Sequence, residues 1–229
     1  MKIVIIHGQN HKGSTYHIAR MLAEKIKGDI KEFFLPRDFG EFCVGCTKCF
    51  MESEKKCPHY EKLRPLTDAM DEADVIILAS PVYVYHVTGA MKTFLDHYGY
   101  RWMVHRPKES MFRKQGVCIS TAAGAGMKPT NKDMADSLFF WGVAKRYQYG
   151  VRVAAVNWNG VSEKKKCAID KATSGIAKKI VNNSKHVKPG IKTRAMFWAM
   201  HFTQRKGFNP CDAEYWKSKG WTGKKRPWK

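Results

Sequence analysis

Residues Lys2–His7 (KIVIIH) are a short run of mostly β-branched side chains, and the polar, glycine-bounded stretch Gly8–Gly13 (GQNHKG) follows directly. Beyond it, apolar residues recur at helical spacing until Gly28. This order predicts a strand, a loop and a helix, with Ser14 as the helix cap. The apolar positions of the predicted helix are Ile18, Met21, Leu22 and Ile26.

The same alternation continues along the chain. Asp74–Ala79 is nearly all apolar, which indicates a strand buried on both faces inside a parallel sheet. Five strands alternating with helices predict an α/β fold, a three-layer doubly wound sheet whose ligands bind at the carboxyl ends of the strands. The other predicted strands are Ile30–Leu35, Gly116–Ser120 and Tyr147–Val156, and the later helices are Glu61–Glu72, Thr88–His97, Thr130–Gly142 and Lys164–Asn183.

The composition changes near the end of the chain, where Trp, Phe, Lys and Gly dominate from Pro189 onward. We therefore predict one domain over residues 1–185 and a basic, aromatic extension over residues 186–229, with a short helix around Met196–Phe202. We expect the aromatic residues of the extension to cover a subunit interface rather than their own sheet. These residues are Trp198, Phe202, Trp216 and Trp221.

The chain has 41 Lys and Arg against 20 Asp and Glu, a net charge of +21. Such a field attracts polyanions, but the excess is scattered late in the chain and no nucleic-acid motif accompanies it. We expect a solvated basic surface, with nucleic acid an unlikely partner. The apolar runs are strand-sized, which predicts no membrane span.

Seven cysteines occur in a chain that enters an apolar strand at once, with no signal-type segment before it. We therefore expect a cytoplasmic protein, in which cysteines serve as thiols or metal ligands rather than disulfides. Cys118, inside an apolar strand, is expected to be a core residue.

The first loop, Gly8–Thr15, is a candidate anion site. Backbone N–H groups and the positive end of the following helix converge there. The loop lacks the Lys-Ser/Thr ending of a Walker sequence and the Gly-x-Gly-x-x-Gly spacing of dinucleotide sites, so a monophosphate is predicted. The candidate ligands are Gln9, His11, Lys12, Ser14 and Thr15.

Two later segments, Ser80–His86 (SPVYVYH) and Thr88–Asp96 (TGAMKTFLD), resemble the region after the third strand in the NADPH-dependent FMN reductase branch of the flavodoxin-like superfamily. The resemblance covers about residues 1–155. It implies a flavodoxin-like fold and FMN as the cofactor, although Gln9 and His11 depart from the family's usual Ser and Arg. It also implies a ring site made by Pro81, Val82, Tyr83 and Val84 on one side and by Thr121, Ala122 and Gly124 on the other.

A cysteine-rich loop, residues 43–57, carries three thiols at two-residue gaps and a fourth further on. The spacing of Cys43, Cys46, Cys49 and Cys57 resembles that of the iron-sulfur flavoproteins, which implies a 4Fe-4S cluster beside FMN. Similar FMN reductases keep such a loop without a cluster, so a cluster, free thiols and tetrahedral zinc all stay open. Because the loop follows the second strand, we expect it near the flavin loops.

The resemblance implies an FMN-dependent oxidoreductase that takes electrons from NAD(P)H and passes them to an acceptor the sequence does not identify. A homo-oligomer, most simply a homodimer, is expected. The alternatives are an electron-transfer protein without its own small substrate and, less favoured, a basic nucleic-acid-binding protein. No catalytic side chain is assigned, although His86 closes the flavin turn and is expected within reach of a substrate.

Overall fold

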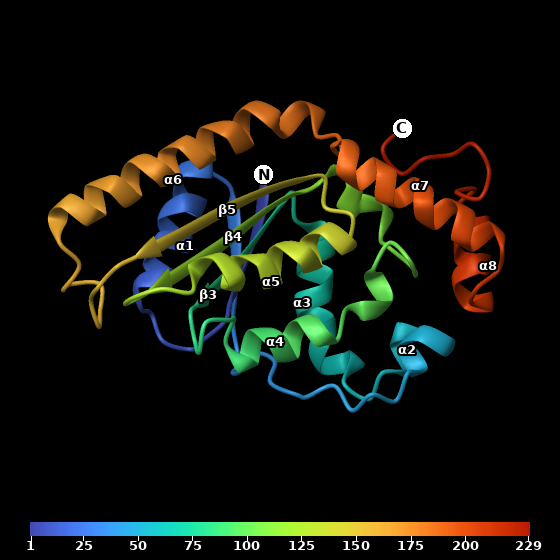
Figure 1. Ribbon diagram of the computed structural model, residues 1–229, viewed down its shortest axis with the longest axis horizontal. Helices are drawn as coiled ribbons and strands as arrows, with labels where there is room; N and C mark the ends of the chain where they lie inside the picture. The colour runs from blue at the N-terminus through green and yellow to red at the C-terminus, as the bar shows by residue number, and fades with distance from the viewer.

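A sheet of five parallel strands in the order β2-β1-β3-β4-β5 forms the centre of the computed structural model, which describes residues 1–229 (Figure 1). The shared register puts Ile3 beside Ile30 of one neighbour and Val75 of the other. This is the strand order of flavodoxin-like proteins, so the predicted fold class is confirmed. The strands are β1 (Lys2–His7), β2 (Asp29–Phe34), β3 (Val75–Pro81), β4 (Gln115–Ala122) and β5 (Lys145–Arg152).

Helices cover both faces of the sheet, because the central strands are apolar on both sides. In β1, Ile3 and Ile5 pack toward one helical layer, while Val4 and Ile6 pack toward the other. The first layer contains α1 (Ser14–Ile26) and α6 (Glu163–Asn183), which lie against each other (Figure 1). The second contains α3 (Tyr60–Glu72), α4 (Gly89–Asp96) and α5 (Met127–Phe140).

Several boundaries differ from the sequence predictions, three of them in ways that matter for the site or the sheet. The α1 cap position is Gly13, with no side-chain bond, so Ser14 is the first helical residue and its hydroxyl does not cap the helix. Helix α5 begins three residues earlier than predicted, at Met127. The last strand starts at Lys145 because its polar first residues pair with β4, and Val153–Val156 leave the sheet.

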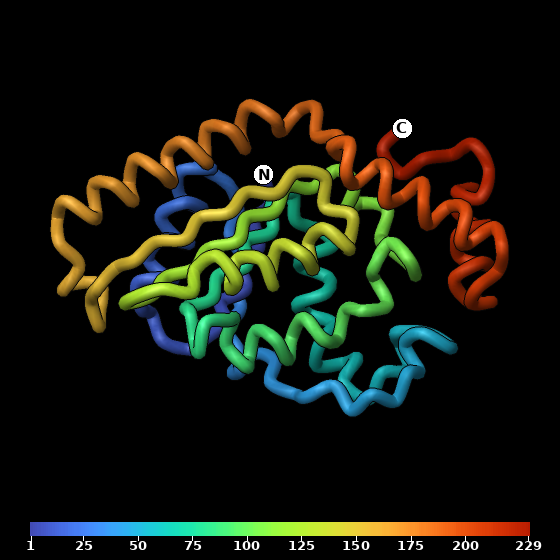
Figure 2. The backbone as a smooth tube through the Cα atoms, in the orientation of Figure 1, coloured from blue at the N-terminus to red at the C-terminus, as the bar shows by residue number.

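The cysteine loop starts at the carboxyl edge of the sheet and then runs away from it, to a short helix that the sequence did not predict, α2 (Lys48–Met51) (Figure 2). Left-handed backbone at Gly45 and Thr47, with φ of 65° and 58°, turns the chain into α2. Helix α2, in the middle of the loop, lies beside α8 (Pro210–Ser218), almost at the other end of the sequence.

The C-terminal extension is helical. The short helix predicted around Met196–Phe202 is the fifteen-residue α7 (Ile191–Arg205), and α8 was not predicted. The expected boundary at residue 185 falls in the turn Ser184–His186 between α6 and α7.

The extension builds a small core of its own against the main domain. Trp216 and Trp221 are buried with Phe197, Met103 and Phe112, so the expectation that these two tryptophans cover a subunit interface is wrong. Aromatic rings of this size are removed from water most simply by stacking on one another within the chain. The remaining two aromatic residues of the predicted patch, Trp198 and Phe202, stay exposed.

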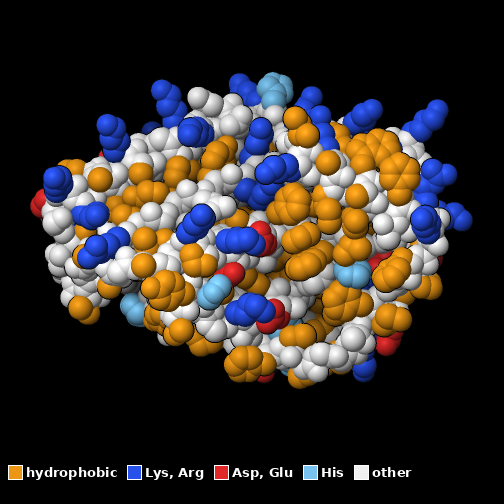
Figure 3. All heavy atoms as spheres, viewed as in Figure 1, with side chains coloured by type: hydrophobic (Ala, Val, Ile, Leu, Met, Phe, Trp, Pro, Cys, Tyr) orange, Lys and Arg blue, Asp and Glu red, His pale blue; other side chains and the backbone are white.

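Lysine and arginine side chains project around much of the rim of the molecule, over α6, α7 and the C-terminal segment (Figure 3). This agrees with the scattered excess of basic residues in the sequence. None of the helices is long and apolar enough to cross a membrane.

One buried carboxylate joins the extension to the cysteine loop. Asp212 of α8 is fully buried and accepts hydrogen bonds from Arg106 Nη1 at 2.6 Å and from His105 Nδ1 at 2.7 Å. Arg106 in turn donates to the backbone carbonyls of Cys49 and Phe50 in α2. The extension thereby positions the backbone that carries the third cysteine.

We expect Asp212→Ala to lower the free energy of unfolding by about 3–5 kcal/mol, because it leaves the buried Arg106 guanidinium without its counter-charge. Urea unfolding followed by circular dichroism measures the change. Asp170→Ala, which removes the exposed partner of Lys25, is the matched control and should cost less than about 1 kcal/mol. Equal effects of the two changes would contradict this account of Asp212.

Candidate functional site

The loop between β1 and α1 places the start of the helix at the carboxyl edge of the sheet. Ser14 and Thr15 are buried there, and no side chain caps the first N–H groups of α1. The first turn also contains no acidic residue. The positive end of the helix is therefore available to an anion.

Loops after β1, β3, β4 and β5 surround a cavity of about 260 Å³, which we call the edge cavity. Thr15 and Thr121, from the first and the third of these loops, bond through their hydroxyls at 2.6 Å. Of the predicted cofactor residues, the cavity is lined by Gln9, His11, Ser14, Thr15, Pro81, Val82, Tyr83, Thr121 and Ala122.

Three predicted residues do not line the edge cavity. Lys12 is exposed with its ammonium 5.4 Å from the centre of the Tyr16 ring, and Gly124 is exposed at the tip of its loop. Val84 points to solvent with 94% of its surface exposed. These residues are therefore not part of the cavity wall.

Sequence reasoning missed a fourth wall of the edge cavity. Val153, Ala155 and Val156 line it, together with Gly13 and Ala123. The apolar run that ends at Val156 was interpreted as a strand, whereas its last residues belong to the loop after β5. The position of these residues just after the last predicted strand pairing is the signal that could have found this wall, because every loop that follows a parallel strand opens on this edge.

A tight turn follows β3 and forms one wall. Tyr83 and His86 exchange both backbone hydrogen bonds, at 3.0 and 3.1 Å, and the two residues between them have positive φ, 48° for Val84 and 67° for Tyr85. This left-handed backbone is rare for a β-branched residue such as valine. Such local strain is typical of functional sites, where the surrounding structure maintains it.

Contacts from several elements maintain the Tyr83–His86 turn. Tyr83 Oη donates to Gln9 Oε1 at 2.8 Å, and His86 Nδ1 lies 2.9 Å from a carboxylate oxygen of Asp133 in α5. Thr88, which caps α4, also donates its hydroxyl to the carbonyl of Gly8 at 2.5 Å. The turn is thus fixed to β1, α4 and α5 at once.

His86 does not line the edge cavity. It borders a separate groove between α4 and α5, of about 450 Å³, together with Lys92, Trp102 and Asp133. The approach of His86 to a substrate at the flavin turn therefore stays a prediction, while its side chain borders this groove and not the edge cavity.

All four loop cysteines line a second, mostly apolar cavity, the cysteine cavity, which also contacts Phe50, His59 and His97. Burial, followed by the charges of the neighbouring thiols, raises the pKa of Cys49 to about 11. Burial also raises the pKa of Cys57, to which Cys46 and Cys43 add. The structure therefore brings together the four thiols that the sequence singled out.

The two cavities border opposite ends of α4. Tyr83, in the turn that precedes α4, lines the edge cavity, and Asp96 and His97 at the other end of α4 line the cysteine cavity. Eight residues of helix span about 12 Å. The cysteine cavity is thus set back from the loops with which the sequence placed it.

Comparison with known proteins identifies the family. Residues 1–153 match the NADPH-dependent FMN reductase family. The chain belongs to this family. Membership of this family is what the sequence predicted.

Two relatives illustrate what the chain is similar to. An iron-sulfur flavoprotein of Archaeoglobus fulgidus is 39% identical over 88 residues, which are 37% of this chain and 36% of that protein. An NADPH azoreductase of Bacillus sp. (strain OY1-2) is 30% identical over 130 residues, 55% of this chain and 61% of that protein. The chain thus matches less than two thirds of the length of either relative.

A solved structure supports the fold. An FMN-dependent NADH-azoreductase from Bacillus anthracis superposes with a TM-score of 0.55 over 77% of this chain and all of that one, at 12% identity. At this identity the likeness concerns the fold alone.

We expect Cys49 to be alkylated last of the four loop cysteines in metal-free protein. The thiolate is the reactive form, and at pH 8 a thiol with a pKa of about 11 is a thiolate roughly 100-fold less often than a free cysteine. Iodoacetamide labelling followed by peptide mass spectrometry measures the order, with the exposed Cys167 as reference. Labelling of Cys49 as fast as Cys167 would disagree with the buried position described here.

Proposed function

We propose that the chain is an FMN-dependent oxidoreductase that takes electrons from NAD(P)H and passes them to a separate acceptor. The observation that supports this most is the edge cavity, which is lined both by the uncapped start of α1 and by the mostly apolar Pro81–Tyr83 segment. A cofactor with an anionic phosphate tail and a flat apolar ring needs an anion site and an apolar wall a short distance apart. The family assignment supports the same reading.

The phosphate of FMN would lie at the start of α1. Ser14 supplies a hydroxyl next to the free N–H groups of the first turn, and His11 adds a ring nitrogen on the same wall. Gln9 Nε2 lies 3.0 Å from His11 Nε2, which orients the imidazole toward the loop. These donors suit one phosphate group, as the sequence predicted.

The ring would lie between the Pro81–Tyr83 segment and the loop of Thr121 and Ala122. Val153 and Val156 add apolar surface that excludes water from the ring edge. Arg152 donates to the carbonyl of Ala123 at 3.1 Å, which places a cation at the cavity rim, where it favours a more negative ring. Bound FMN supplies the redox chemistry, accepting two electrons from a nicotinamide and releasing them singly or in pairs.

The role of the protein in this proposal is positioning. No acid or base side chain is required, because the wall residues hold the ring with one face toward a nicotinamide and exclude water from the other. The Tyr83–His86 turn keeps its shape through bonds to Gln9 and Asp133, so the wall is formed before a ligand binds.

We expect Ser14→Glu to abolish flavin retention while the fold stays intact. The new carboxylate would occupy the start of α1 and repel the phosphate. Flavin absorbance per chain after gel filtration measures retention, and circular dichroism reports the fold. Ser174→Glu on the exposed face of α6 is the control. Unchanged flavin affinity in Ser14→Glu would place the phosphate elsewhere.

We further propose that Cys43, Cys46, Cys49 and Cys57 hold a 4Fe-4S cluster. Four thiols line one cavity, closely enough that, after burial, charges of neighbouring thiols add to the raised pKa of Cys49 and of Cys57, and an iron-sulfur flavoprotein is among the relatives. Mutual repulsion between thiolates is relieved when they share a cationic centre. Such a centre would carry single electrons.

Two features support our proposals for the location and the oligomeric state of the protein. Seven free thiols support a cytoplasmic location, because a reducing compartment keeps them unpaired. Exposed apolar residues on α7, namely Ile191, Trp198 and Phe202, support a homodimer that covers them.

Protein prepared without oxygen should contain about four irons and four sulfides per chain. We expect Cys46→Ser to lose both while keeping FMN, because Cys46 lies in the cysteine cavity and not in the edge cavity. Metal analysis and acid-labile sulfide measure the loss, with Cys167→Ser as control. Iron-free anaerobic protein with full NAD(P)H oxidation would leave a plain FMN reductase.

A further inference from the structure

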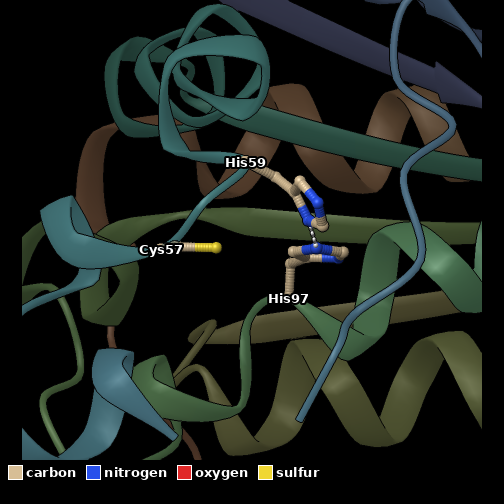
Figure 4. Close-up of side chains that lie close together, drawn as sticks. All are labelled: Cys57, His59 and His97. Atoms are coloured by element: carbon tan, nitrogen blue, oxygen red, sulfur yellow. Dashed lines mark hydrogen bonds between the residues drawn. The ribbon is translucent and has the colours of Figure 1, made fainter. Parts of the chain in front are cut away.

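Two imidazoles and one thiol meet on the wall of the cysteine cavity, where the proposed cluster uses only the thiol. The ligand atoms of Cys57, His59 and His97 all lie within 4.8 Å of one another (Figure 4). Cys57 and His59 come from the segment before α3, and His97 follows α4 directly. Figure 4 shows the three side chains directed toward a common point.

The ring of His97 is held in the orientation of a metal ligand. Its Nδ1 lies 2.8 Å from the carbonyl oxygen of Thr93, so this nitrogen donates and the lone pair of Nε2 faces His59. Phe39 packs edge-on against the ring, and His97 is only 5% exposed. A backbone carbonyl that fixes the far nitrogen of an imidazole is the usual support of a histidine ligand.

The distance between the two imidazole nitrogens suits two ligands of one tetrahedral ion. At Zn–N of about 2.0–2.1 Å and Zn–S of about 2.3 Å, two nitrogens stand about 3.3 Å apart, and sulfur and nitrogen about 3.6 Å. His59 Nδ1 and His97 Nε2 are 3.1 Å apart, at the hydrogen bond that the ion would replace.

We propose that Cys57, His59 and His97 bind one Zn²⁺ ion whenever the four-thiol set does not hold its cluster. Binding releases the thiol proton of Cys57 to solvent, and the Nδ1 proton of His59 moves to Nε2, so that both donor atoms face the ion. Water or Cys49, on the same cavity wall, completes four ligands. Cluster and zinc both require Cys57, so one chain holds one or the other.

The test uses the full chain with Cys43→Ser and Cys46→Ser together, in which a four-thiol cluster cannot form. Both cysteines are exposed, so the double change leaves the core intact. The protein is incubated with zinc sulfate and desalted, zinc per chain is measured by mass spectrometry, and affinity by competition with a coloured chelator. We expect about one zinc per chain.

His97→Ala or His59→Ala in this background should weaken zinc binding roughly 100-fold or more, since even outer-shell changes cost about 10- to 100-fold. His186→Ala, which removes an exposed histidine between α6 and α7, is the matched control and should change nothing. Circular dichroism and flavin retention verify the fold, and the less buried His59 gives a second variant if His97→Ala unfolds.

No zinc in the double serine background would overturn the proposal, as would wild-type zinc affinity after either histidine change. These outcomes leave the proposed function standing, because iron, sulfide and FMN in the unaltered protein are measured separately. Conversely, a wild-type protein without iron that still binds zinc through the histidines removes the cluster and keeps the zinc site.

Discussion

The three central strands are apolar on both faces, and most of the structure follows from this one constraint. Ile3 and Ile5 require one helical layer, and Val4 and Ile6 require the other, so each strand must be followed by a helix that crosses over the sheet. Crossovers of one hand leave all the strands parallel, with their carboxyl ends at one edge. The loops that follow the strands therefore meet at that edge, and four of them surround the edge cavity.

This regularity explains how much could be predicted from the sequence. Composition alone indicates buried parallel strands at Asp74–Ala79 and Lys2–His7. The topology of the sheet then places the loops that follow them. The direction of the Val84 side chain could not be predicted in the same way. It depends on a backbone φ of 48°, which no residue pattern indicates. The prediction of a strand through Val153–Val156 was wrong because an apolar run resembles a strand even where pairing has ended.

The cysteine loop shows the limit of local patterns more clearly. Spacing alone grouped Cys43, Cys46, Cys49 and Cys57 correctly into one cavity. It said nothing of His97, which is forty residues beyond Cys57 and reaches the cavity only because α4 has that length. Contacts of this kind depend on three-dimensional packing, and they appear only once neighbouring elements are assembled.

The two cavities differ in how much of the chain must be synthesised before all the residues that form or support them are present. The edge cavity is lined by residues between Gln9 and Val156, all on the first two thirds of the sequence. The backbone of α2, by contrast, is held by Asp212 through Arg106 and by Cys211, whose Sγ lies 2.9 Å from the carbonyl oxygen of Met51. During synthesis the main domain can fold as its strands emerge, while the cysteine loop reaches its final geometry only after the last helix has left the ribosome. Insertion of the proposed metal at this loop would therefore be a late, post-translational event.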